Sequence, residues 1–180
     1  MRRSVAVGLL AATFVAACSG GGGDDDATPP TQAGDGLRLP ATEDDLSDTV
    51  LAGLAGGEIA FADYAGRPIV VNFFASTCAP CVREMPAIEA VKQDVGAEVA
   101  FVGVATNDRV DAARDRAEET GVTWDLANDP QGAFITAVGG VVLPTTLFVD
   151  ADGAVLEVHG GQISGDELRE ELEERFGIES

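Results

Sequence analysis

The fold of this chain is decided by the stretch FFASTCAPCVREMP, residues 73–86. The apolar run that enters it, residues 69–74, is typical of a strand buried on both faces. After it, apolar side chains recur at steps of three and four residues, the spacing of a helix; they are Val82, Met85, Ile88, Val91 and Val95. Pro80 suits the first turn of that helix, where a missing backbone N–H costs nothing. The sequence therefore places Cys78 where a strand ends and a helix begins.

A cysteine at the start of a helix has a particular chemistry. Unpaired backbone N–H groups and the positive end of the helix dipole favour the thiolate, which is the reactive form. Cys81 lies one turn further on and can close a small disulfide ring with Cys78. A zinc site would need two more ligands, but the chain has only one other cysteine, Cys18, and one histidine, His159. A structural disulfide over so short a loop adds little stability. We therefore interpret the two cysteines as a redox pair and expect no metal.

Four segments of the chain resemble a known family. They are Val71-Asn72-Phe73-Phe74-Ala75, Cys78-Ala79-Pro80-Cys81, Arg83-Glu84-Met85-Pro86 and Leu143-Pro144-Thr145-Thr146. Their order and spacing resemble the membrane-anchored thioredoxin-like oxidoreductases of the TlpA/ResA type, and the resemblance covers about residues 45–177. It implies an α/β protein with a thioredoxin-like fold: a mixed central sheet flanked by helices, with an N-terminal β-hairpin and a central insertion.

The rest of the domain is consistent with that order of elements. Two short apolar stretches in residues 46–61 indicate a hairpin, and the DADG turn at residues 150–153 indicates another. A helix over about residues 109–120 would bury Val110, Ala113 and Ala117. Asn128-Asp129-Pro130 is typical of a turn. Ser164 and Glu167 form a capping box at the start of the last helix.

The N-terminal part predicts export and a membrane anchor. Residues 1–17 carry a basic start and an apolar run too short to span a bilayer, which indicates a signal peptide. The run ends Val15-Ala16-Ala17-Cys18, which resembles a bacterial lipobox with Cys18 as the lipidated residue. Residues 18–44 are then a flexible tether, and residues 45–180 the thioredoxin-like domain. The alternative is an ordinary secretory signal. Either implies an extracytoplasmic location, at the cell surface or in the periplasm.

Composition limits the partners. The chain has 180 residues, enough for one domain with a core, and a formal net charge of -20. No basic stripe is present to hold phosphates, so nucleic-acid binding is disfavoured. The acidity favours solubility. We expect a monomer without a cofactor.

The resemblance also implies site residues. The Leu143–Pro144 bond would be cis, with the proline against the two cysteines, and the substrate groove would be formed by Thr77, Ala79, Pro80, Leu143 and Pro144. A proline leaves the preceding backbone free to pair with an extended substrate. Thr77 is a departure, because many relatives have tryptophan there.

Glu84 is the nearest candidate for proton transfer. It follows Cys81 by three residues, on the same face of the predicted helix. In ResA-like proteins a glutamate at this spacing assists proton transfer, whereas thioredoxin keeps a buried acid where this chain has Asn72. A solvated helix residue is the alternative. For His159 we expect a plain surface role, and for Trp124 a place in the core.

Together these observations predict a lipid-tethered thiol-disulfide oxidoreductase that reduces disulfides of exported proteins. Cys78 would attack the substrate disulfide, and Cys81, deprotonated with help from Glu84, would resolve the mixed disulfide. By resemblance the substrates are apocytochrome c, as in cytochrome c maturation, or copper-site assembly proteins, and a membrane thiol carrier supplies the electrons. The alternatives are a disulfide oxidase or isomerase of the same fold, a non-catalytic partner-binding lipoprotein and, with less support, a peroxidase.

Overall fold

The computed structural model describes residues 37–39 and 45–179, all within one compact unit, Ala33–Ser180. The predicted signal peptide and Cys18 lie outside the described residues. Leu37–Leu39, which the sequence assigned to the tether, forms strand β1 and pairs with β8. Among the described residues, no helix is both long and apolar enough to cross a membrane.

A mixed sheet forms the centre of the described part of the chain. Its strands follow one another in the order β1-β8-β7-β4-β5-β6-β2-β3. β4, β5 and β6 run parallel, and every other pairing is antiparallel. After β1, the strands are β2 (Val50–Gly53), β3 (Glu58–Ala60), β4 (Ile69–Phe74), β5 (Ala100–Thr106), β6 (Asp125–Asp129), β7 (Thr145–Val149) and β8 (Val155–Gly160).

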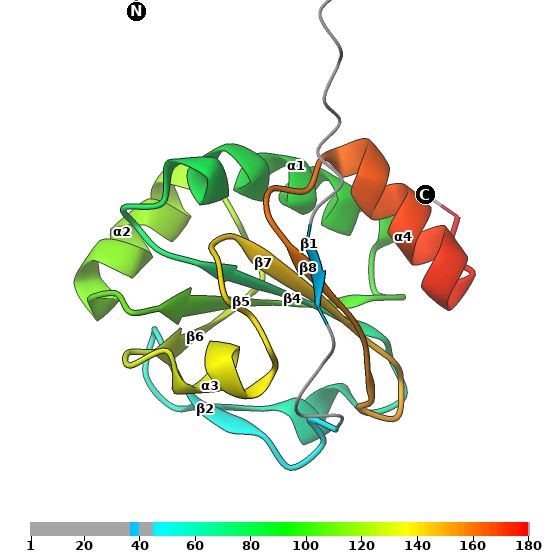
Figure 1. Cartoon of the computed structure of the whole chain (residues 1–180), viewed down its shortest axis with the longest axis horizontal. Coiled ribbons are helices and arrows are strands. Elements are labelled where there is room, and N and C mark those ends of the chain that lie inside the picture. Colours follow the sequence, from blue (N-terminus) through cyan, green and yellow to red (C-terminus); the bar gives the residue numbers. More distant parts are fainter. Residues whose placement is uncertain (1–36, 40–44, 180) are drawn as a thin grey trace, which may run out of the picture. The chain divides into compact units, whose positions relative to one another are not determined.

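Helices cover both faces of this sheet, as the family resemblance implies (Figure 1). One face carries α1 (Ala79–Val95), α2 (Val110–Thr120) and α4 (Gly165–Phe176), and the other carries α3 (Ala133–Ala137) and the 3-10 helix η1 (Phe61–Tyr64). β4 is buried along its whole length, as its apolar run predicts. Its side chains alternate between two cores, because Val70 and Phe74 pack under α1 while Val71 and Phe73 pack against the opposite layer.

The predicted order of elements is confirmed. β2 and β3 form the expected N-terminal hairpin, and β7 and β8 form the second one around residues 150–153. Between β5 and β7 the middle of the chain contains α2, β6 and α3, where the central insertion was expected. Trp124 is buried and stacks on Phe101, so its predicted core position is confirmed.

Two local predictions differ from the structure, each for a physical reason. The predicted turn begins at Asp129 rather than at Asn128, because Asp129 is the last residue of β6 and its carbonyl accepts the N–H of Gly132. Asp129 is buried because its carboxylate accepts the N–H groups of Phe134 and Ile135 in the first turn of α3. Val110 is the first residue of α2 and is 40% exposed, so only Ala113 and Ala117 form the buried face.

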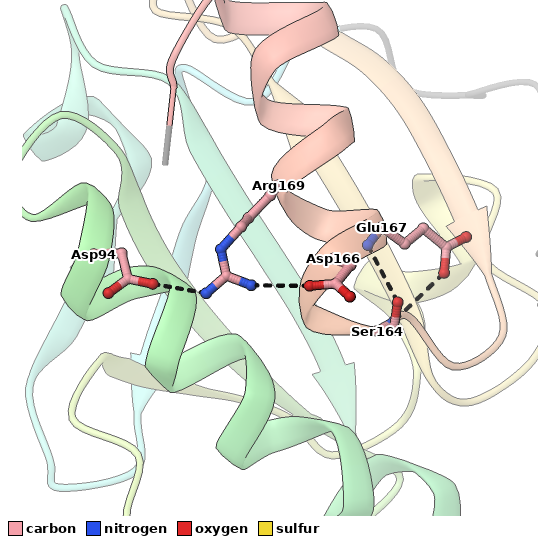
Figure 2. A network of polar contacts seen from close by, with 5 residues as sticks. All are labelled: Asp94, Ser164, Asp166, Glu167 and Arg169. Carbon is pink, nitrogen blue, oxygen red and sulfur yellow. Dashed lines mark hydrogen bonds and ion pairs between the residues drawn. The ribbon is translucent and has the colours of Figure 1, made fainter.

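The last helix is fixed at its start by side chains. Ser164 and Glu167 form the predicted capping box, since Ser164 Oγ accepts the N–H of Glu167 and Glu167 Oε2 accepts the N–H of Ser164 (Figure 2). Arg169 of α4 donates to Asp94 of α1 at 2.7 Å and to Asp166 at 3.4 Å. These contacts hold α4 against α1 and fix the segment just before α4, which contacts the active site.

Candidate active site

The two cysteines occupy the place that the sequence predicts. β4 ends at Phe74, Cys78 is the N-cap of α1, and Cys78 and Cys81 form a disulfide with their Cα atoms 5.3 Å apart. The backbone N–H of Cys81 donates to Cys78 Sγ at 3.3 Å. Cys78 is partly exposed and Cys81 is fully buried. An external thiol can therefore reach the sulfur of Cys78 first.

The predicted groove residues meet at one edge of the sheet. Thr145 of β7 pairs with Phe73 of β4, so the loop before β7 lies beside the end of β4 where the cysteines begin. The Leu143–Pro144 bond is cis, as the resemblance implies, and Leu143 packs against the same core as Cys78. Thr77 and Ala79, which flank Cys78 in the sequence, are exposed, and Pro80 is partly exposed.

A pocket lies next to this loop, and the sequence analysis did not predict it. It has a volume of about 410 Å³ and lies between the end of β5, at Thr106 and Asn107, and the segment 140–143. Val141 and Val142 at its rim are 69% and 42% exposed. The two adjacent valines shortly before Pro144 were the feature of the sequence that could have indicated this pocket. Adjacent valines are, however, also typical of a buried strand.

Glu84 is buried, with 1% of its surface exposed, so it is not a solvated helix residue. Its Oε1 accepts from the side-chain amide of Asn72 at 2.8 Å, and its Oε2 accepts from the backbone N–H of Ile163 at 2.9 Å. Burial raises the pKa of Glu84 to about 7, although the hydrogen bonds from Ile163 and Asn72 act in the opposite direction. A carboxyl group with this pKa can exchange a proton near neutral pH.

A row of polar side chains extends from Glu84 across the sheet. Asn72 of β4 donates to Glu84 and, at 3.3 Å, to Thr146 of β7, which pairs in register with His159 of β8. His159 is 1% exposed, so its predicted surface role is wrong. The reason is topological, because β1 pairs along the outer edge of β8 and His159, in register with Thr146, shares the sheet face that α1 and α4 cover.

Sequence comparison identifies one protein family and several relatives that are similar to this chain. The sequence model of the Redoxin family matches residues 33–173. The thiol-disulfide oxidoreductase ResA of Geobacillus thermodenitrificans is 32% identical over 129 residues, which cover 70% of this chain and 73% of that protein.

Solved structures agree with the sequence comparison. A secreted disulfide oxidoreductase of Mycobacterium tuberculosis, homologous to E. coli DsbE, is 27% identical with a TM-score of 0.61, over 67% of this chain and 91% of that chain. A DsbF homologue from Corynebacterium diphtheriae is 26% identical with a TM-score of 0.66, over 76% and 87%. This chain therefore belongs to the Redoxin family and is a thiol-disulfide oxidoreductase of the ResA and DsbE type, with Cys78 and Cys81 as its cysteine pair.

Proposed function

We propose that this protein is a lipid-tethered, extracytoplasmic reductase of disulfides in exported proteins. The observation that carries the proposal is the asymmetry of the pair, a partly exposed Cys78 at the start of α1 joined to a buried Cys81. This asymmetry suits a protein that presents one sulfur to a substrate and keeps the other for resolution. The secreted relative from Mycobacterium tuberculosis supports the location.

The mechanism follows from the two positions. In the reduced protein the Cys78 thiolate attacks one sulfur of a substrate disulfide, forms a mixed disulfide and releases the first substrate thiolate, which takes up a proton. Cys81, buried beside Cys78, then attacks Cys78 Sγ and releases the second substrate thiol. The protein disulfide forms again, and two electrons have passed to the substrate. A membrane thiol carrier must restore the dithiol, because an extracytoplasmic compartment is oxidising.

Glu84 is the proposed acceptor of the Cys81 proton. It lies one helical turn after Cys81 and is equally buried, where bulk water cannot act as the base. The Asn72 and Ile163 donors stabilise the carboxylate that this transfer creates.

The substrate binds as an extended segment in this proposal. Thr77, Ala79 and Pro80 contact it from the cysteine side, and Leu143 and Pro144 from the other. Pro144 has no N–H, so the carbonyl and N–H of the preceding backbone remain available for strand addition. Apocytochrome c and copper-site assembly proteins are the substrates that we propose, and their transient binding is consistent with a monomer.

The tether is tested through Cys18. Two or more acyl chains contribute about 0.8 kcal/mol per buried methylene and anchor a protein stably. We expect Cys18→Ala to move the full-length protein from the membrane fraction to the soluble fraction or to leave it unprocessed. Fractionation together with intact mass measures this, and an unchanged mass in the membrane fraction would contradict the lipidation of Cys18.

Trapping experiments test the roles within the pair. Cys81→Ser removes the resolving thiol, so we expect mixed disulfides with substrates to accumulate. Cys78→Ser removes the attacking thiol, so we expect none. Non-reducing electrophoresis after acid quenching measures both. The opposite result, with complexes only in Cys78→Ser, would reverse the two roles.

Glu84 should make stability depend on pH. Its pKa rises from 4.5 to about 7 on folding, so its contribution is fully present below pH 4.5 and is lost as pH rises through 7. The loss is about 3 kcal/mol at most. Glu84→Gln imitates the neutral acid, so the free energy of unfolding of the oxidised variant should change less between pH 5 and 8 in urea titrations. Glu118→Gln, which removes an exposed carboxylate, serves as the control, and the pH dependence of its free energy of unfolding should match that of the unsubstituted protein.

The same variant tests proton transfer. Without a carboxylate near Cys81, resolution of a preformed mixed disulfide at neutral pH should slow by about tenfold or more. Stopped-flow measurements over a range of pH report this step. A pH–rate profile identical to that of the unchanged protein would leave Glu84 with a structural role only.

The direction of electron flow is tested by the reduction potential. The spacer Ala79-Pro80 contains no cation, so the Cys78 thiolate, and with it the reduced form, gains no stabilisation from between the sulfurs. We expect a potential nearer about -270 mV, as in thioredoxin, than about -120 mV, as in DsbA. The gap corresponds to about 7 kcal/mol. Equilibration with dithiothreitol or glutathione measures it, and a midpoint near the DsbA value would indicate the oxidase alternative instead.

A further inference from the structure

A single carboxylate holds the turn that carries the reactive cysteine. We define the redox turn as residues 75–78, between β4 and α1. Within it, Ser76 donates its backbone N–H to Asp108 Oδ2 at 2.5 Å and its hydroxyl to Asp108 Oδ1 at 2.9 Å. Asp108 is 32 residues away along the chain. The Asp108 carboxylate therefore accepts both hydrogen bonds that Ser76 donates. Ser76 lies two residues before Cys78.

The register of the sheet explains why Asp108 reaches this turn. β4 and β5 are parallel, and Phe74 pairs with Ala105, so the segments that follow both strands leave the same edge of the sheet. Asn107 then takes a left-handed backbone conformation with φ 51°, and its N–H donates to the carbonyl of Asp129. This bend turns the chain out of β5, and Asp108 follows it directly.

The charge of Asp108 is not neutralised by a salt bridge within the described residues. The neighbouring Arg109 forms its ion pair with Asp111, although its charge also interacts with Asp108 and its backbone N–H donates to Asp108 Oδ1 at 2.8 Å. The other acid near the cysteines, Glu84, is buried under them and is held by Asn72 and Ile163. Asp108 is thus a partly exposed carboxylate, held on Ser76 two residues before Cys78.

A negative charge at this place opposes the effect of the helix. The α1 N-terminus and the Cys81 N–H favour the thiolate of Cys78, whereas a nearby carboxylate disfavours it. A less stable thiolate makes the reduced form less stable and the disulfide harder to reduce. The same residue thus shapes the turn and acts on its redox equilibrium.

We propose that Asp108 is a positioning residue of the redox turn whose charge makes the Cys78–Cys81 pair more reducing. This inference deepens the proposed reductase function but does not depend on its success, because it concerns a shift relative to the unchanged protein. An oxidising potential in the unchanged protein would overturn the reductase proposal and leave the shift caused by Asp108 measurable.

The test uses the full-length protein and its Asp108→Asn variant. Asparagine keeps an oxygen to accept a hydrogen bond from Ser76 and removes the charge. We expect the equilibrium constant for reduction by dithiothreitol to rise about three- to tenfold, and the alkylation rate of Cys78 to titrate at a lower pH. Because Asp108 is partly exposed, salt screens its charge, and the shift should be smaller in about 1 M salt.

Two variants separate charge from shape. Ser76→Ala loses one hydrogen bond but keeps the charge, and Glu118→Gln removes a charge at an exposed position of α2 away from the cysteines. Both should leave the equilibrium constant within about twofold. No shift in Asp108→Asn, an equal shift in Ser76→Ala, or a shift that persists unchanged in high salt would each overturn the proposal.

Discussion

The active site depends on the pairing of β4 with its two neighbours. Parallel pairing with β5 and antiparallel pairing with β7 align Phe74 with Ala105 and Phe73 with Thr145. The end of β4, the end of β5 and the start of β7 therefore meet at one edge of the sheet. This alignment brings the cysteines, the loop of Asp108 and the cis-Pro144 loop together, although they are up to 66 residues apart in the sequence. A slip of one residue in either pairing would move these segments out of alignment and turn the strand side chains to the wrong face.

The electrostatics of the pair result from groups on several elements. The start of α1 favours a thiolate at Cys78, and the Cys81 N–H already points at its sulfur. Below the pair, burial favours the neutral form of Glu84, while Asn72 and Ile163 favour its charged form. Ile163 is in place because the capping box and Arg169 fix the start of α4 (Figure 2). The segment that leads into the last helix thus contributes to the protonation of Glu84, three residues after Cys81.

Three local assignments differ from the structure, each for a physical reason. His159, Asp129 and Val110 were assigned from their side-chain type and local spacing. His159 is buried because β8 has a neighbour on each side, and Asp129 because its carboxylate satisfies the first turn of α3. Val110 is exposed because it begins α2, where the helix has not yet reached the sheet. Contacts distant in the sequence decided the burial of His159, whereas the burial of Asp129 and the exposure of Val110 follow from neighbouring elements close in the sequence.

Local sequence patterns were enough to predict the strand, the cysteine pair and the helix of residues 69–95, both hairpins and the capping box of α4. These features are local, since apolar spacing, turn residues and caps act over a few neighbours. The sequence also pointed to Glu84 and Pro144 through a family resemblance. The burial of Glu84 between Asn72 and Ile163, the hydrogen bonds from Ser76 to Asp108 and the pocket beside residues 140–143 became visible only in the folded chain. Those facts depend on strand register and helix packing, which join residues that no local pattern connects.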